Sequence, residues 1–457
     1  MASSKKTSYV CRECGETSLQ WQGRCAACGN WNSFEEIALS KTAQASRAPA
    51  GNRSLTQGST AILSLAEVKV EDTVRWPTGS VELDRALGGG LVPGAVVLIG
   101  GDPGIGKSTL TLQVVSAIAE QRRAVYVTGE ESAAQVAARA QRLDLALAPI
   151  RVLAETNLEA IFDLISKDRP QVVVIDSIQT LYSDAYSSAP GSVVQVRECA
   201  ADLIRYAKAN GVSVLIVGHV TKEGTIAGPR VLEHLVDTVI YFEGEAGSSI
   251  RIIRALKNRF GASNEIGVFS MTENGLRAVA NPSVLFLHNT QSLSAGNVVF
   301  PAIEGSRPLL VQIQALVDRT AGNPRRVCNG VDAQRLAMLL AVMNRHLGSQ
   351  LSGFDVFVNV VGGISVDEPA ADLAIIAAIW SSLTGRVLPS QQVLFGEIGL
   401  GGEIRPVVGA AIRIGEAEKL GFESVICGDL GKTLRTRAGL KLQTAARVDA
   451  AIELLRA

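Results

Sequence analysis

One nine-residue segment has the composition and spacing of a phosphate-binding loop. Residues 101–109 read GDPGIGKST, directly after an apolar run and directly before a helical pattern. Glycines at these spacings let the backbone bend until its N–H groups converge on phosphate oxygens, while the lysine reaches the β- and γ-phosphates and the serine ligates Mg²⁺. We predict a site for ATP and Mg²⁺ built from Gly101, Asp102, Pro103, Gly104, Ile105, Gly106, Lys107, Ser108 and Thr109.

Three further apolar runs end in side chains suited to nucleotide hydrolysis. Asp176 closes the run VVVID, either as a ligand of the metal beside Ser108 or as an ordinary helix-capping aspartate. Glu130 follows VYVTG, where a carboxylate can orient and deprotonate an attacking water; a solvated pair with Glu131 is the alternative. His219 ends VLIVGH, either as a sensor of the γ-phosphate or as a structural histidine.

Four of the seven cysteines form two pairs near the N-terminus. Cys11-x2-Cys14 and Cys25-x2-Cys28 are each followed by glycine. This spacing is typical of a closed four-thiolate Zn²⁺ site, and the metal would stabilise a unit too small to fold by burial alone. Two disulfides or loose thiols are the alternative, although the scattered remaining cysteines suit a reducing cytosol.

Two cations flank an asparagine in the segment ALKNRFGAS, residues 255–263. Lys257 and Arg259 lie two residues apart before a Phe-Gly turn, which concentrates cationic hydrogen-bonding capacity in a short stretch. An anionic ligand is one interpretation of this pattern, and a solvated basic turn is the other.

The predicted elements position these side chains. Continuous apolar runs alternate with helical segments between residues 62 and 280, a pattern typical of α/β proteins with a parallel sheet covered on both faces. The runs that we interpret as buried strands are residues 95–101, 124–129, 171–177, 212–219 and 237–244. The nucleotide-site candidates follow the carboxyl ends of these strands.

The chain divides into four predicted regions. Residues 1–35 form the cysteine-rich finger, and residues 36–61, rich in Ser, Thr, Ala and Gln, indicate a flexible linker. The ATPase-like region 62–280 precedes residues 281–457, where strand-like runs around a helical stretch indicate an α+β domain.

Composition limits which partners the whole chain can attract. The 457 residues include 44 Lys and Arg against 44 Asp and Glu, so contact with a polyanion requires a local patch. The longest apolar runs are too short to span a bilayer, and the N-terminus lacks the apolar stretch of a signal peptide. We therefore expect a cytoplasmic protein without a membrane partner.

The order of these motifs resembles that of known proteins. A phosphate loop, a glutamate after the next strand, an aspartate at a strand end and a polar sensor are similar to the RecA-like ATPase core. Together with the four-cysteine finger, the segments GHVTKEG, VLEHLVDTV and KNRFG resemble the bacterial RadA (Sms) family of DNA-repair proteins over essentially the whole chain. The resemblance implies a DNA-dependent ATPase that forms a homo-oligomeric, hexameric ring. It also implies that this ATPase works with RecA on single-stranded and branched DNA and drives branch migration.

The resemblance also implies roles for the basic residues. In RecA-like rings such cations reach the γ-phosphate of the neighbouring subunit, so Lys257 and Arg259 are expected to be catalytic in trans, to contact DNA, or both. A strand-exchange filament without motor action, and a nucleotide-dependent switch or kinase, are the alternatives.

Two loops are expected to line a DNA channel. Residues 185–197 and 221–230 contain Gly, Ser and Pro with isolated cations, as contacts to phosphate without base readout would require. The candidate contacts are Arg197, Lys222 and Arg230.

Part of the C-terminal region resembles the Lon protease. Segment 362–379 has Ala370 where the Lon serine follows proline, and the spacing from Pro406 puts Ala411 in the place of the catalytic lysine. Because two methyl groups can neither attack nor accept a proton, we expect a Lon-like fold without peptidase activity. An active ATP-dependent peptidase is the alternative.

Such a domain is expected to hold the ring together and to offer basic surface to duplex DNA. The candidate cations for this surface are those of residues 323–326 with Lys432, Arg435 and Arg437. Arg413 and Lys419 remain candidates for a displaced catalytic amine.

Overall fold

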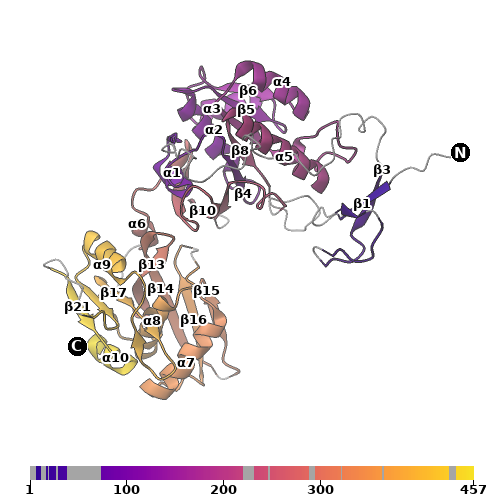
Figure 1. The fold of residues 1–457 in the computed structure, drawn as a ribbon. Coiled ribbons are helices and arrows are strands. Elements are labelled where there is room, and N and C mark those ends of the chain that lie inside the picture. The colour runs from indigo at the N-terminus through magenta and orange to yellow at the C-terminus, as the bar shows by residue number, and fades with distance from the viewer. Residues whose placement is uncertain are drawn as a thin grey trace, which may run out of the picture. The chain divides into compact units, whose positions relative to one another are not determined.

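The computed structural model divides into two compact units, Met1–Val279 and Ala280–Ala457 (Figure 1). The residues described are 7–11, 17–18, 20–26, 29–38, 74–219, 231–244, 248–287, 294–320, 322–362, 365–431 and 439–456. Within these segments, no helix is long and apolar enough to cross a membrane.

A small antiparallel sheet forms near the N-terminus, in the order β2-β1-β3. Its strands are β1 (Thr7–Cys11), β2 (Thr17–Ser18) and β3 (Phe34–Ala38). The apolar cluster described in this region consists of Cys11, Cys25 and Phe34, with Tyr9 packed against it. A cluster of this size cannot hold a fold by apolar burial alone, which fits a ribbon stabilised by metal.

A nine-stranded mixed sheet forms the centre of the first unit, in the order β12-β11-β10-β9-β4-β8-β7-β5-β6. Its strands are β4 (Val96–Gly100), β5 (Ala124–Thr128), β6 (Arg151–Ala154), β7 (Val172–Asp176), β8 (Ser213–Val217), β9 (Thr238–Glu243), β10 (Ile250–Asn258), β11 (Ile266–Thr272) and β12 (Gly275–Ala278). Strands β4 to β9 run parallel, as the continuous apolar sequences of β4, β5, β7, β8 and β9 predict, whereas the sequence pattern does not predict β6. Strands β10 to β12 extend the sheet with antiparallel pairing, which the apolar pattern does not predict.

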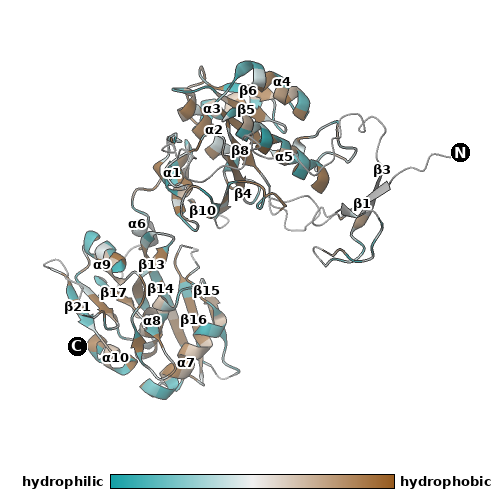
Figure 2. Cartoon of the chain, in the orientation of Figure 1, coloured by the Kyte–Doolittle hydropathy of each residue, from teal (hydrophilic) through white to brown (hydrophobic). Residues whose placement is uncertain are grey.

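Helices cover both faces of this sheet. They are α1 (Val81–Leu87), α2 (Lys107–Ala119), α3 (Ala133–Arg142), α4 (Leu158–Asp168) and α5 (Val193–Asn210). Buried residues of α1, α2 and α3 share one apolar cluster, while those of α4 and α5 share a second cluster with the other sides of the same strands. Each helix has an apolar side and a polar side, as packing of one side against the sheet requires (Figure 2).

The structure corrects one predicted loop. Helix α5 begins at Val193, and the Ser192 side chain caps it by accepting a hydrogen bond from the Gln195 N–H. Arg197 therefore lies on a helix rather than in a channel loop, and it forms an ion pair with Glu198 at 3.4 Å.

The second unit is built on a mixed seven-stranded sheet, in the order β15-β16-β14-β13-β17-β20-β21. Its strands are β13 (Asn297–Glu304), β14 (Arg307–Arg319), β15 (Arg326–Asn329), β16 (Phe354–Val360), β17 (Gln392–Phe395), β20 (Ser424–Cys427) and β21 (Lys441–Thr444). A two-stranded hairpin consists of β18 (Glu397–Ile398) and β19 (Ile404–Arg405). The helices are α6 (Pro282–Phe286), α7 (Ala333–Leu347), α8 (Asp372–Thr384), α9 (Ala410–Lys419) and α10 (Val448–Arg456). Helix α8 is apolar around most of its circumference because it packs against β13, β14 and β17.

Candidate functional site

The phosphate-binding loop joins β4 to α2 at the carboxyl ends of the parallel strands, which form one edge of the sheet. Gly101, Gly104 and Gly106 have φ angles of 146°, 75° and 119°, a region that other residues rarely adopt. A Cβ at Gly104 would meet no described atom within 4 Å, so the centre of the loop is open. The loop therefore presents a cradle of backbone N–H groups at the start of a helix, which fits a nucleotide phosphate.

Lys107 is buried at the base of this loop. Its Nζ donates hydrogen bonds to the carbonyl oxygens of Gly101 at 2.7 Å and Asp102 at 2.9 Å. Burial lowers the pKa of Lys107 to about 8, and this effect outweighs the opposing charges of Asp176, Asp102 and Glu130. The ammonium group therefore lacks a fully compensating anion, which a phosphate would supply.

Asp176 lies at the end of β7, next to a residue that the sequence did not single out. The hydroxyl of Tyr126, on β5, donates a hydrogen bond to Asp176 Oδ2, and both side chains are buried. Burial and the neighbouring Asp176 carboxylate raise the pKa of Tyr126, so the phenol stays protonated and remains a donor. This bond fixes one carboxylate oxygen of Asp176 and orients the group.

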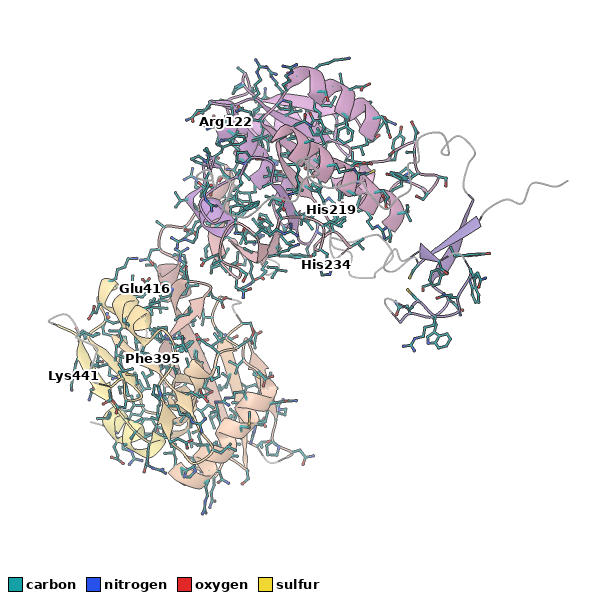
Figure 3. The ribbon with its side chains drawn as sticks, in the orientation of Figure 1. Arg122, His219, His234, Phe395, Glu416 and Lys441 are labelled. Carbon is teal, nitrogen blue, oxygen red and sulfur yellow. The ribbon has the colours of Figure 1, made fainter. Side chains whose placement is uncertain are left out.

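Glu130 and His219 meet at the same edge. The Ser177 hydroxyl donates to Glu130 Oε1 at 2.7 Å, and His219 Nε2 lies 3.5 Å from the same oxygen. His219 is labelled in Figure 3. Burial and, second, the charge of Lys107 lower the pKa of His219, which favours a neutral imidazole at this position. The structure thus brings together the acidic, basic and imidazole groups that the sequence places at strand ends.

Glu131 has a different environment from its neighbour. Its carboxylate pairs with Arg139 of α3, and its N–H donates to Thr128 Oγ1 at 3.0 Å. Glu131 therefore anchors the start of α3, and Glu130 is the residue that faces the site.

Arg251 contacts the phosphate loop from an antiparallel strand. Its Nε donates to the carbonyl of Ile105 at 3.2 Å. Strand β10 begins at the same edge of the sheet as the loop, which is why this cation comes close. Because the contact depends on β10 pairing antiparallel to β9, local sequence gave no signal for it.

The KNRFG segment lies at the other edge of the same sheet. In the register of the sheet, Asn258 pairs with Thr238 and Thr238 pairs with Val97, whereas the phosphate loop follows Gly100. At about 3.3 Å per residue, this strand alone separates the two sites by about 10 Å. The KNRFG segment therefore lies at the opposite end of the strands from the phosphate loop of its own chain.

Contacts with neighbouring elements hold both cations in place. Lys257 Nζ donates to the carbonyls of Glu233 at 2.9 Å and His234 at 3.2 Å, and burial followed by the nearby Arg259 lowers the pKa of Lys257. Arg259 Nη1 lies 3.4 Å from Oδ1 of the buried Asp237, yet its side chain is 55% exposed. Most of the Arg259 guanidinium therefore faces solvent.

Several predicted site residues cannot be placed. Cys11 and Cys25 are buried in the ribbon, whereas Cys14 and Cys28 lie outside the described residues. The predicted DNA contacts Lys222 and Arg230, and the basic residues Lys432, Arg435 and Arg437, also lie outside them.

The peptidase-like segments of the second unit contain an ion pair. Ala370 lies in a 3-10 turn (Pro369–Ala371), and Ala411 lies on α9. The buried Arg413 guanidinium donates to Glu368 Oε1 at 3.0 Å and also bonds the second carboxylate oxygen. A guanidinium in such a pair cannot act as a general base.

The remaining candidate cations of this unit have structural contacts. Lys419 is exposed and lies 3.6 Å from Glu416. Within residues 323–326, Arg325 pairs with Asp355 at 2.7 Å, and Arg326 Nη2 donates to the carbonyl of Leu351 at 2.9 Å. These two arginines therefore hold the sheet edge at β15.

Family comparisons match both functional regions of the first unit. A family model described as an AAA domain matches residues 67–225, and one described as a rubredoxin metal binding domain matches residues 9–36. Among solved structures, a KaiC-like protein from Pyrococcus horikoshii aligns with 46% of this chain and 100% of its own chain at 20% identity, with a TM-score of 0.39.

Similarity to individual proteins extends over the full length of the chain. DNA repair protein RadA of Pseudomonas aeruginosa is 52% identical over 458 residues, which cover 100% of both chains. The proteins of the same name from Haemophilus influenzae and Salmonella typhimurium are 52% and 50% identical, each over 93% of both chains. The chain described here therefore belongs to the RadA family of DNA repair proteins.

Proposed function

We propose that this protein is a ring-shaped motor in which ATP hydrolysis drives movement along single-stranded DNA. In this role it extends heteroduplex at branched recombination intermediates and acts together with RecA. The observation that carries the proposal is the position of KNRFG at the sheet edge opposite to the phosphate loop of the same chain. Lys257 bonds two backbone carbonyls and Arg259 pairs with Asp237, but the Arg259 side chain is still 55% exposed and is available to an anion of another molecule.

The carboxyl edge of the sheet supplies the groups for hydrolysis. When bound, Mg²⁺ would supply positive charge that neutralises the charge developing during phosphoryl transfer. Ser108 and Asp176 are suited to hold the metal, and Lys107 to hold the phosphates. Glu130, oriented by the Ser177 hydroxyl, would accept a proton from the attacking water. His219 would sense the γ-phosphate and transmit its presence to the chain segment that follows His219.

Lys257 and Arg259 would act on a neighbouring protomer. Both are held by contacts within the chain, so little conformational entropy is lost when they meet a phosphate. A cation supplied in trans can accelerate phosphoryl transfer by about 10³–10⁵. The same segment would couple hydrolysis to a DNA strand if it also contacts DNA phosphates.

The other regions would support this motor. Buried Cys11 and Cys25 fit a zinc site completed by Cys14 and Cys28. The second unit would serve as a scaffold for the ring, with alanines in place of the two groups that peptide hydrolysis requires.

ATP turnover with and without single-stranded DNA tests the proposal. We expect Lys107→Arg to abolish turnover and Lys257→Ala to bind nucleotide normally while losing most of its DNA-stimulated turnover, about a hundredfold or more. Lys419→Ala, which removes an exposed lysine of the second unit, is the matched control and should behave as wild type. Full DNA stimulation in Lys257→Ala would rule out the trans role.

A further inference from the structure

Two of the four tryptophans lie exposed on the N-terminal ribbon. Trp21 is 55% exposed and Trp31 is 70% exposed, whereas Trp76 and Trp380 are only 8% and 4% exposed. Both exposed indoles lie beside Gly23, because a Cβ there would be 3.8 Å from Trp21 Cη2 and 3.9 Å from Trp31 Cζ3. Neither ring joins the described apolar cluster of the ribbon. Large aromatic rings gathered in solvent in this way mark an interaction surface.

Backbone hydrogen bonds form a hairpin that contains Arg24 and Trp31. Arg24 and Trp31 form an antiparallel bridge. On either side of it, the Cys25 N–H donates to the Asn30 carbonyl at 2.9 Å and the Asn32 N–H donates to the Gly23 carbonyl at 2.7 Å. Trp31 and Arg24 therefore lie on a preformed hairpin, with Trp21 two residues before it, which reduces the entropy lost on binding.

One cation lies next to the rings. Residues 17–34 contain one charged side chain, Arg24, and no Asp or Glu, whereas Glu16 precedes this stretch and Glu35 and Glu36 follow it. The Arg24 guanidinium lies 5.8 Å from the centre of the Trp31 ring, and its Nε donates to the Gly29 carbonyl at 2.9 Å. The residues next to each tryptophan in the sequence are exposed amides: Gln20, Gln22, Asn30 and Asn32.

We propose that Trp21, Trp31 and Arg24 form a platform that binds an unpaired nucleic-acid strand. Bases stack on the two indoles, and Arg24 contacts a phosphate of the same strand. Aromatic rings next to a cation are the usual composition of surfaces that bind single strands, because every base offers a π-face. A duplex does not fit this surface because its base faces are covered by their neighbours. The platform is separate from the ATPase site and from KNRFG.

Intrinsic fluorescence provides a direct test in the full-length protein loaded with zinc. Since Trp76 and Trp380 are buried, an added strand can stack on only Trp21 and Trp31 among the four tryptophans. We expect oligo(dT) of about 16 nucleotides to quench the emission and to protect it from acrylamide. A blunt duplex of the same length should do neither. Absence of quenching by oligo(dT) would overturn the proposal.

Paired substitutions separate stacking from folding. Trp21→Ala and Trp31→Ala should each weaken binding of oligo(dT) about fivefold or more, whereas Trp21→Phe and Trp31→Phe should restore most of the affinity. Arg24→Gln should reduce the slope of log affinity against log salt by about 0.7. Zinc content measured for each variant checks that the ribbon is intact. Equal affinity of the alanine variants and wild type would overturn the proposal and leave a protein partner as the occupant of this surface.

The result is independent of the motor proposal. In Lys107→Arg, where turnover is expected to be lost, quenching by oligo(dT) should persist. DNA-stimulated turnover without quenching would refute the platform alone, whereas quenching without DNA-stimulated turnover would refute the motor alone.

Discussion

Lys107 must hold a charge that its surroundings disfavour. Its ammonium is buried and bonded to two carbonyl oxygens, and burial lowers its pKa to about 8. Binding of phosphate requires the charged form, whose population falls as pH rises through that value. The buried position therefore links nucleotide affinity to pH near neutrality.

We expect nucleotide affinity, measured without Mg²⁺, to be constant below about pH 7 and to fall by up to tenfold per pH unit above about pH 8. A fluorescent ATP analogue titrated between about pH 7 and about pH 9.5 measures this directly. Lys107→Arg is the matched control, since a guanidinium stays charged throughout and its binding should show no such decline. Parallel pH profiles for the two proteins would contradict this explanation.

The individual site residues differ in how far sequence could predict them. The loop glycines, Lys107, Glu130, Asp176 and His219 follow strand ends, and local pattern is sufficient to position them. Tyr126 and Ser177 have no local signal because their roles come from contacts between strands that are distant in sequence. Tyr126 in particular lies within an apolar run, so its sequence context indicates only a core residue.

At the scale of elements, the hydrogen bond from Tyr126 to Asp176 joins strands β5 and β7 next to the site proposed for the metal. A carboxylate with one oxygen held by a donor presents its other oxygen in a defined direction, and removal of such a partner commonly costs about 10–100-fold in metal affinity. With Asp176 in its proposed role as a magnesium ligand, the pairing of these two strands would contribute to metal binding as well as to the core.

Tyr126→Phe should therefore raise the Mg²⁺ concentration needed for half-maximal turnover about tenfold or more, because Asp176 loses its hydrogen-bond donor. Nucleotide binding without Mg²⁺ should be unchanged, and thermal stabilisation by ATP should need correspondingly more Mg²⁺. Tyr186→Phe removes a similar bond to Asp202, 3.2 Å long, and serves as the control. An unaltered Mg²⁺ requirement in Tyr126→Phe would show that Asp176 is oriented by other contacts.

The sequence predicts those strands whose pattern of apolar residues is determined by burial alone. Strands β4, β5, β7 and β8 are continuous apolar runs because both faces of the sheet are covered, so they are evident in the sequence, whereas the short and partly exposed β6 is not. The antiparallel strands β10 to β12 are not evident in the sequence, because β10 mixes charged and apolar residues. The edge of the sheet that carries KNRFG follows from the direction of β10, which local sequence cannot give.

In the whole molecule, the nucleotide site and the KNRFG cations lie at opposite ends of the strands of the ATPase sheet. One edge carries the phosphate loop and its acidic partners, and the other carries Lys257 and Arg259. An arrangement of this kind has a natural use when copies of the chain associate, because the cationic edge of one copy can meet the nucleotide of the next. ATP hydrolysis would then depend on assembly of the copies, and it would be coupled to DNA that several copies bind.

Mixing two inactive variants tests this claim most directly. Lys107→Arg retains the KNRFG cations, and Lys257→Ala retains the phosphate loop, so a mixed ring contains interfaces with both groups intact. We predict that the mixture recovers DNA-stimulated ATP turnover that neither variant shows alone. A mixture of Lys257→Ala with the double variant Lys107→Arg/Lys257→Ala should stay inactive. If the first mixture also stayed inactive while the variants assembled together, the cations would not act across the interface and the central claim would be wrong.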